Sequence, residues 1–501
     1  MFCATSLLRN FWLCALTCTC LFGTSLRAEG PAKVYVVLWF DTEDYILPAS
    51  DDAALKVADW LHRQGIRATF KVVGEKARTL ERRGRDDVIA ALNQHEIGFH
   101  ANWHSVQPSP AMYLSNLGWD EGVAEFDRRE RAGFEDVKRI FGQTPTCYGQ
   151  PGSSWGPQSF GAMNKWGMKI YLDAGRHVSV DAKPHYFCRT FTMYHLAHTI
   201  RTNLGGEKDL KPAEDRFVEA RQKLLAEGGG IVSTVYHPCE FVHQQFWDGV
   251  NFSKGENPPR EQWKLPPKKT DAESKLAYET FESYVTFMKR FPDVQFITAT
   301  EAAEIYKDRA AGRSFTEDEI KSIAARVSAA IDYQTHGDYS LTPSEILQLL
   351  NSYFVDRSAG RKAAAAKLKD TPLGPTGAAP ATADLVRTNA SQFRRTAIDV
   401  DDFLAKQGRV PSAVWLGSTA VTPEAYLAAL ARIVVELIEG KPMPDKIELK
   451  PAVLATTKCV AEDSPKLWGW VIFPPGFRAP AMMELAKRQA WSIKPAINHG
   501  R

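Results

Sequence analysis

The segment VYVVLWFDTED, residues 34–44, decides the fold of this chain because an unbroken apolar run ends directly in a group of carboxylates. Every residue from 34 to 40 is apolar, β-branched or aromatic, which is typical of a parallel strand that is buried on both faces. The acidic side chains therefore lie where a strand ends. In α/β folds, barrels included, ligands and catalytic groups collect at the carboxyl ends of parallel strands.

Two further segments place histidines at predicted strand ends. His100 and His104 follow the short apolar piece 96–99, and their i, i+4 spacing puts both imidazoles on one side of a helical or near-helical turn. His237 follows the strand-like run 231–236. Each piece alone is more often a solvated turn or a strand cap. Together they supply the carboxylates and histidines that a mononuclear metal needs to activate water for hydrolysis.

The order and spacing of these segments resemble the NodB-type polysaccharide deacetylases, carbohydrate esterases that remove acetyl groups from N-acetylated sugars. The resemblance covers about residues 33–308 and implies a distorted (β/α) barrel of about seven strands. The segments in the places of successive family motifs are 40–44, 68–74, 98–105, 145–157 and 235–240.

The resemblance also implies catalytic roles for matching residues. Asp41 would be the general base that takes a proton from the attacking water, and His237 the general acid that protonates the leaving amine. Asp173 would orient His237 through a hydrogen bond. The backbone N–H near Gly152 would help to stabilise the oxyanion, and Trp155 suggests an aromatic floor for the substrate, although a turn is an equal interpretation of this segment.

A divalent metal ion is implied in the same way, with Glu43, His100 and His104 as its ligands. Glu43 is preferred over Asp44, which is the alternative, because Glu43 lies two residues after Asp41 and so on the same strand face. Two histidines and one carboxylate with open positions suit zinc. Cobalt, nickel or manganese fit the same ligand set, so the identity of the metal stays open.

One position departs from the family pattern. The third motif usually begins with an arginine that orients the catalytic aspartate, whereas Gly149 stands at the matching position here, followed by Gln150. Three explanations remain open: another group holds Asp41, the substrate is unusual, or activity has been lost.

The leading hypothesis is an exported hydrolase of non-peptide carbon–nitrogen bonds that deacetylates amino sugars in a cell-wall or extracellular polysaccharide. A second hypothesis keeps the metal chemistry but applies it to a non-sugar amide, as in allantoinase-like relatives. A third is a non-catalytic carbohydrate-binding protein with the same fold. Retention of every acidic and histidine group of the site argues against the third.

Composition and the N-terminal segment fit an exported protein with several parts. The 501 residues are 44% hydrophobic and 24% charged, and the net charge of +3 gives no reason to expect a nucleic-acid partner. Arg9 precedes the apolar run 11–22, and cleavage near Ala28 would complete a secretory signal. The run is too short for a confident transmembrane helix, so a periplasmic, cell-surface or extracellular location without a membrane span is expected.

The region beyond the catalytic part is predicted to form small, mainly α-helical C-terminal domains. Residues 386–445 read as a helix-strand-helix unit that resembles a pseudomurein-binding repeat, chiefly through 403–411 and 422–426, and so suggests contact with a cell-wall polymer. A structural domain that packs on the barrel is an equal interpretation. The predicted parts are a signal peptide (1–28), the catalytic domain (29–310), a helical appendage (311–370), a linker (371–385), the repeat-like unit (386–445) and a Trp/Pro-rich segment (446–501).

Overall fold

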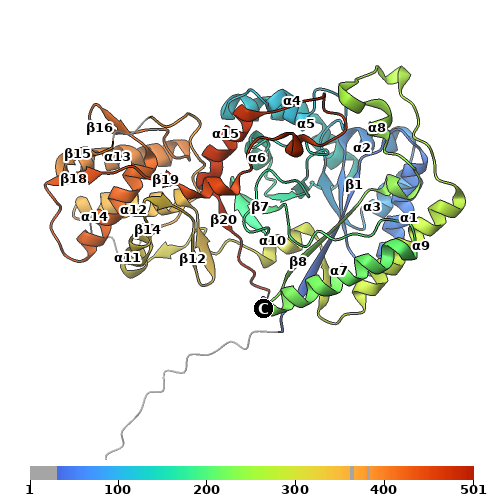
Figure 1. The fold of residues 1–501 in the computed structure, drawn as a ribbon, viewed down its shortest axis with the longest axis horizontal. Helices are drawn as coiled ribbons and strands as arrows, with labels where there is room; N and C mark the ends of the chain where they lie inside the picture. The colour runs from blue at the N-terminus through green and yellow to red at the C-terminus, as the bar shows by residue number, and fades with distance from the viewer. Residues whose placement is uncertain (1–30, 362–365, 381–383, 501) are drawn as a thin grey trace, which may run out of the picture. The chain divides into compact units, whose positions relative to one another are not determined.

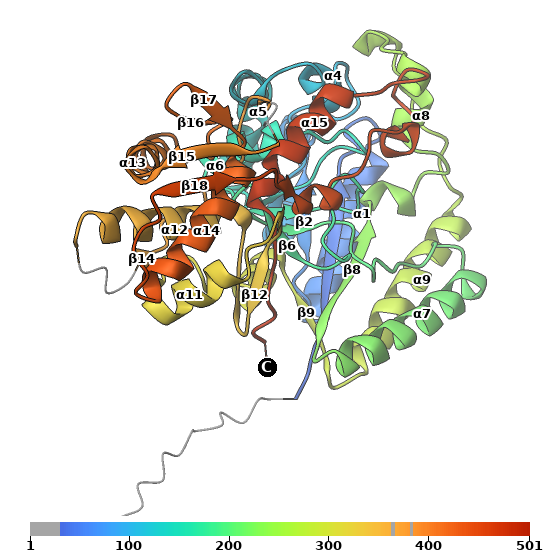
Figure 2. The same ribbon diagram turned by 60° about the vertical axis from the view of Figure 1, so that its left-hand side comes forward.

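The computed structural model describes residues 31–361, 366–380 and 384–500. The predicted signal peptide, residues 1–28, lies outside the described residues. Residues 32–501 cluster into one compact unit, whose strands and helices are drawn in Figures 1 and 2. Within the described part of the chain, no helix is both long and apolar enough to cross a membrane.

A ten-stranded sheet is the framework of the fold. Its strand order is β20-β6-β7-β5-β4-β3-β2-β1-β8, and β9 also pairs with β1. The pairings from β7 through β8, and that of β9, are parallel, whereas β6 and β20 add an antiparallel edge. The strands are β1 (Val34–Thr42), β2 (Thr69–Val72), β3 (Glu96–Phe99), β4 (Cys147–Tyr148), β5 (Ile170–Leu172), β6 (His185–Phe187), β7 (Thr190–Met193), β8 (Gly230–Tyr236), β9 (Val294–Ile297) and β20 (Lys494–Pro495).

The parallel part of this sheet curls so that its two ends are joined. Thr199, in the segment that follows β7, forms an isolated parallel bridge with Ser233 of β8. The N–H of Ile200 donates to the carbonyl oxygen of Ser233 at 2.9 Å, and the N–H of Ser233 donates to that of His198 at 2.9 Å. The predicted α/β class and distorted barrel are therefore confirmed.

Strand β1 is the centre of the sheet, as its apolar sequence predicts. All nine of its residues are buried. It pairs with β8 along residues 34–40, with β9 along 34–37 and with β2 along 39–42. Because the strand continues to Thr42, Asp41 belongs to the strand itself and Glu43 follows its last residue.

Amphipathic helices cover the barrel. In α1, for example, the buried residues Ala54, Val57, Ala58 and Leu61 recur at helical spacing and join the main hydrophobic core. The helices of this region are α1 (Ala49–Arg63), α2 (Gly74–Arg82), α3 (Asp86–Leu92), α4 (Pro110–Leu114), α5 (Trp119–Phe141), α6 (Gln158–Lys165), α7 (Glu207–Ala226), α8 (Trp247–Asn251), α9 (Asp271–Lys289) and α10 (Ala299–Ile305).

The C-terminal region is mainly helical, as predicted, with short two-stranded sheets between the helices. Helix α12 begins after Thr342, whose side chain accepts from the N–H of Glu345 in a capping box, with Pro343 at the first position. The helices and strands of this C-terminal region are β10 (Ser314–Phe315), α11 (Glu317–Ala325), β11 (Ala330–Ile331), β12 (Gln334–His336), β13 (Tyr339–Leu341), α12 (Pro343–Ser358), β14 (Ala366–Lys367), β15 (Val386–Asn389), α13 (Ala390–Gln407), β16 (Val414–Leu416), β17 (Thr419–Val421), α14 (Pro423–Ile438), β18 (Lys446–Leu449), β19 (Val453–Leu454) and α15 (Pro480–Gln489).

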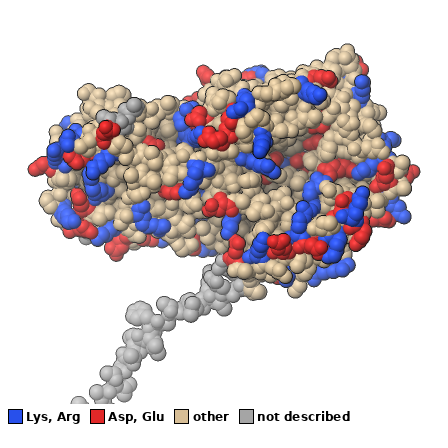
Figure 3. Space-filling model, viewed as in Figure 1, with Lys and Arg blue, Asp and Glu red and all other residues tan. Residues whose placement is uncertain are grey.

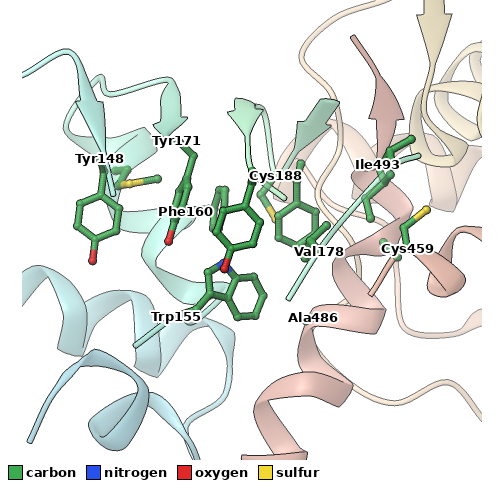
Figure 4. Close-up of a cluster of buried hydrophobic side chains, with 14 of the residues drawn as sticks. Tyr148, Trp155, Phe160, Tyr171, Val178, Cys188, Cys459, Ala486 and Ile493 are labelled. Carbon is green, nitrogen blue, oxygen red and sulfur yellow. The ribbon is translucent and has the colours of Figure 1, made fainter. Parts of the chain in front are cut away.

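The hydrophobic core is continuous between the barrel and the C-terminal region. Figure 4 shows Trp155, Phe160 and Tyr171 of the barrel in the same buried cluster as Ala486 and Ile493. The predicted linker takes part in this packing, since the N–H of Gly374 donates to Gln489 Oε1 at 3.0 Å and the N–H of Leu373 donates to the Gly408 carbonyl at 2.9 Å. The boundaries of the predicted parts stay predictions.

Charges of both signs are mixed on the face that Figure 3 shows. Lys and Arg side chains alternate there with Asp and Glu over the described residues. This mixture agrees with the small net charge of +3. Such a face lacks the single-sign field that attracts a polyanion.

Candidate metal centre

Three side chains that the sequence selects as metal ligands meet at the carboxyl end of the barrel strands. Ligand atoms of Glu43, His100 and His104 all lie within 4.8 Å of one another, and all three residues are buried. Glu43 Oε2 is 2.9 Å from His104 Nε2 and 3.5 Å from His100 Nε2. Two imidazoles and one carboxylate, facing one another away from water, form a donor set suited to a divalent cation.

The Nδ1 atom of each histidine lies within hydrogen-bond distance of a neighbouring oxygen. His100 Nδ1 lies 2.9 Å from the carbonyl oxygen of Gly149, and because a carbonyl only accepts, this nitrogen carries the proton. His104 Nδ1 lies 2.8 Å from Ser105 Oγ. The Nε2 atoms of both rings are buried and face the Glu43 carboxylate, with no other hydrogen-bond partner among the described residues. Such orientation by contacts at Nδ1, with both Nε2 atoms turned toward one carboxylate, fits a metal ligand set.

The backbone around these histidines differs from the predicted turn. His100 follows the last residue of β3, but residues 101–105 are irregular rather than helical. Ala101 and Ser105 adopt left-handed conformations, with φ of 72° and 70°. The two imidazoles nevertheless lie on one side, with ring centroids 5.3 Å apart.

Asp44 does not take part in this centre. Its Oδ1 accepts hydrogen bonds from the backbone N–H groups of Ile46 and Leu47, at 2.9 and 3.0 Å. Its carboxylate belongs to a different cluster, with Cys239 and His243. The structure thus places Glu43, the preferred residue, beside the histidines and directs the alternative elsewhere.

Lys71 contacts Asp41 in place of the arginine that the family pattern leads one to expect. Asp41 and Lys71 are register partners on the parallel strands β1 and β2. Lys71 Nζ is 2.9 Å from Asp41 Oδ1 and 3.2 Å from Asp173 Oδ2, and the side chain is fully buried. It also donates to the carbonyl oxygen of Leu172 at 2.9 Å. The ammonium group is therefore the counter-ion of two buried carboxylates.

The same contact explains the glycine at position 149. A Cβ atom added to Gly149 would lie 1.9 Å from Lys71 Nζ, so no larger residue fits while the lysine is in place. The space where a family arginine would begin is filled by the ammonium group of Lys71, from strand β2. A lysine inside the strand-like, mostly apolar segment 68–73 was the sequence signal for it, because unpaired lysines are almost never fully buried.

Glu240, and not Asp173, orients His237. His237 Nδ1 lies 2.5 Å from Glu240 Oε1, and Nε2 lies 3.6 Å from Asp41 Oδ2. Glu240 belongs to the short 3₁₀ helix η1 (Pro238–Phe241) and forms an ion pair with Arg201. The prediction that Asp173 orients His237 is wrong, because Asp173 is the second carboxylate of Lys71.

The charges of the site set its ionisation. Burial alone would lower the pKa of His237, but Glu43, Glu240 and Asp41 raise it to about 9. For Asp41, burial acts to raise the pKa, yet His100, Lys71 and His237 outweigh it, and the pKa falls below its ordinary value. At neutral pH the site therefore presents a carboxylate base beside a protonated imidazole.

A cavity of about 550 Å³ opens over these groups, within the size range of small-molecule sites. Asp41, Glu43, His104 and His237 line it, as do Gly152 and Asp173. A C-terminal segment, residues 466–471, completes the wall.

Trp470 forms much of this added wall. Its Nε1 donates to Asp248 Oδ2 at 2.6 Å and its backbone N–H donates to Ser153 Oγ at 3.1 Å. Its ring centroid is 4.9 Å from that of His104. A Cβ atom on Gly152 would lie 2.2 Å from the Trp470 ring, so the glycine gives the indole its space.

Trp155 does not line the substrate floor as predicted. Only 1% of its surface is exposed, and it stacks on His177 with centroids 5.0 Å apart and an interplanar angle of 11°. The buried cluster of Figure 4 contains this indole. Trp470, from a segment more than 300 residues further along the chain, lines the pocket together with Trp39 and Phe246.

Comparison with known proteins gives distant structural likenesses only. No protein-family model matches the chain, and no curated protein matches it. Among solved structures, the PuuE allantoinase is 11% identical with a TM-score of 0.36, and a probable polysaccharide deacetylase from Pseudomonas aeruginosa PAO1 is 11% identical with a TM-score of 0.35; each match covers 55% of this chain and 90% of the other. A family 4 acetyl xylan esterase from Clostridium thermocellum, in complex with a cobalt ion, is 14% identical with a TM-score of 0.29, over 54% of this chain and 91% of the other.

Proposed function

We propose that this protein is a metal-dependent hydrolase that removes N-acetyl groups from amino sugars of a cell-wall or extracellular polysaccharide. The observation that carries the proposal is the meeting of Glu43, His100 and His104, with both buried Nε2 atoms facing the Glu43 carboxylate, beside Asp41 and His237 at one cavity. Release of acetate with an equal amount of free amine from N-acetylated oligosaccharides tests it.

The ligand set fits one divalent ion, zinc in the first place, with cobalt, nickel and manganese as alternatives. An ion held by Glu43, His100 and His104 would supply Lewis acidity, which polarises an amide carbonyl and makes water more acidic.

The remaining steps belong to side chains of this chain. Asp41 accepts a proton from the attacking water as the new carbon–oxygen bond forms. His237 donates a proton to the leaving nitrogen as the carbon–nitrogen bond breaks, which gives acetate and a free amine. The backbone near Gly152, at the edge of the cavity, is proposed to donate to the developing oxyanion.

Lys71 and Glu240 act through these two groups as positioning residues. Lys71 favours the ionised form of Asp41, and Glu240 holds the proton and the ring orientation of His237. The missing arginine was the reason to consider loss of activity or an unusual amide. A buried cation at 2.9 Å from Asp41 removes that reason and favours a catalytic site over a non-catalytic one.

Replacement of Glu240 by glutamine should move the alkaline limb of the pH–rate profile to lower pH by about one unit. Glu240 is one of the charges that raise the pKa of His237, so its removal lowers that pKa. A general acid works only below its pKa, and activity would be lost earlier as the pH rises. The check is kcat against pH, with the exposed Glu219→Gln as control. An unmoved alkaline limb would show that Glu240 does not set the ionisation of His237.

Replacement of Trp470 by alanine should raise KM for a short N-acetylated oligosaccharide by about tenfold, with a smaller change in kcat. The indole forms a wall of the cavity but contacts none of the proposed proton-transferring groups. Steady-state kinetics of this variant, with metal content measured alongside, provide the check. Leu265→Ala is the control, because Leu265 is 61% exposed and is not among the residues that line the cavity. An unchanged KM would place the substrate elsewhere.

Export and wall binding complete the proposal. A periplasmic, cell-surface or extracellular site of action would follow from cleavage near Ala28, which lies outside the described residues. For the repeat-like unit, residues 386–445, contact with a cell-wall polymer stays a prediction. Its exposed apolar side chains Ile398, Phe403 and Trp415 are the ones to examine for such contact.

A further inference from the structure

A second cluster of metal-ligating side chains includes Asp44, the residue that follows Glu43 along the chain. Ligand atoms of Asp44, Cys239 and His243 lie within 4.8 Å of one another. The three residues are 2%, 1% and 4% exposed, so the cluster is shielded from water. They come from two segments: Asp44 follows β1, and the other two lie in and just after η1, beyond β8.

Two polar atoms of this cluster are buried without a partner. Asp44 Oδ2 and His243 Nδ1 have no hydrogen-bond partner, whereas the other carboxylate oxygen of Asp44 accepts from two backbone N–H groups. A buried polar atom without a partner is costly and therefore calls for an explanation.

We propose that Asp44, Cys239 and His243 bind a second divalent cation, of the zinc type, separate from the ion of the first centre. A thiolate, a carboxylate and a neutral imidazole carry two negative charges, which a divalent ion balances. Sulfur, nitrogen and oxygen ligands together favour zinc over calcium or magnesium, which prefer oxygen alone. The fourth position is open to a water molecule. This proposal does not depend on the proposed function.

Backbone hydrogen bonds hold the two segments that carry the cluster in place. The N–H of His243 donates to the carbonyl oxygen of Cys239 at 3.0 Å, which holds both side chains on one turn. Lys76 Nζ donates to the backbone oxygen of Asp44 at 2.6 Å and so fixes the other segment.

The second ion would join two segments of the first site. Asp44 adjoins Glu43, and Cys239 lies between His237 and Glu240 along the chain. An ion bound to both segments would brace the loop that carries the proposed general acid. Its role is therefore structural, since its ligands are buried and are not among the residues that line the main cavity.

The test uses full-length protein that is stripped of metal and reconstituted with Co²⁺, because a thiolate bound to Co²⁺ gives a ligand-to-metal absorption in the near ultraviolet. We expect two equivalents of cobalt and this thiolate band. Cys239→Ser should lose the band and one equivalent. His104→Ala should keep the band and lose the other equivalent. Cys188→Ser, another buried free thiol, should keep the band and both equivalents.

A single equivalent in the wild type without the thiolate band would overturn the proposal, as would a band that persists in Cys239→Ser. His243→Ala and Asp44→Asn guard against a folding defect of the serine variant, since each should also lower the stoichiometry by one. If instead both variants keep two equivalents of cobalt, the cluster binds no metal and its side chains are protonated rather than coordinated, which would also overturn the proposal. Because the band reports sulfur, its absence is distinguishable from a failure of the first centre, which has no sulfur ligand.

Discussion

Asp41→Asn should lower kcat for amide hydrolysis by a factor of about 100 to 10,000 while leaving the metal content unchanged. An asparagine keeps the size of the side chain but cannot accept a proton at neutral pH. The three proposed metal ligands are untouched by this change, because Asp41 lies beside them as the proposed base and its counter-ion is Lys71. The folded state should survive, since Lys71 keeps its second carboxylate, Asp173.

The measurement is kcat by acetate release together with elemental analysis of the bound metal. Asp402→Asn, on the exposed face of α13, is the control for a carboxylate lost at the surface. Two results would contradict the assignment. A kcat within a factor of two or so of the wild type would show that Asp41 is not the base. Loss of the metal would show that Asp41 is a ligand.

Lys71→Met should lower the free energy of unfolding by about 3–5 kcal/mol at neutral pH, as is usual when one partner of a buried ion pair is removed. Two buried carboxylates, Asp41 and Asp173, would then lack their common counter-ion. Urea denaturation at several pH values measures this effect. Lys406→Met, an exposed lysine paired with Asp402, should change stability by less than about 1 kcal/mol.

The pH dependence of this variant has a definite sign. Burial raises the pKa of Asp41, and Lys71 is one of the charges that bring it below its ordinary value. A carboxyl group whose folded pKa is lowered contributes stability above its unfolded pKa, and this contribution is lost as the pH falls through the folded pKa. Without Lys71 the pKa of Asp41 rises, so the destabilisation should be largest at neutral pH and shrink in acid.

The acid limb of the pH–rate profile should move in the same direction, to higher pH, because the base would be protonated earlier as the pH falls. A Lys71→Met protein with unchanged stability and an unmoved acid limb would refute the role given to this lysine.

The parts of the site that follow one strand could be predicted from the sequence. Strands that end at residues 42, 99 and 236 deliver Glu43, His100 and His237 to one end of a parallel sheet. The strand-like runs pointed to these positions, and the resemblance to the deacetylases supplied the barrel that joins them. The choice of Glu43 over Asp44 also followed from the alternation of side chains along a strand.

The parts that depend on register or on long-range packing could not be predicted. Lys71 meets Asp41 because β1 and β2 pair in one particular register, which no local pattern specifies. Trp470 reaches the cavity from a segment 317 residues beyond Ser153. The prediction that Trp155 forms the substrate floor failed because a tryptophan near a turn can point into the core as readily as towards a ligand, and Trp155 is buried.

Acetate release by metal-reconstituted protein from a panel of N-acetylated oligosaccharides tests the central claim most directly, with His104→Ala measured beside the wild type. The account predicts acetate and an equal amount of free amine from at least one sugar, and loss of both acetate release and one equivalent of metal in the variant. A wild type that holds its metal yet releases no acetate from any sugar would contradict the sugar-deacetylase assignment and direct the search to non-sugar amides. A wild type that binds no metal at all would contradict the hydrolase itself.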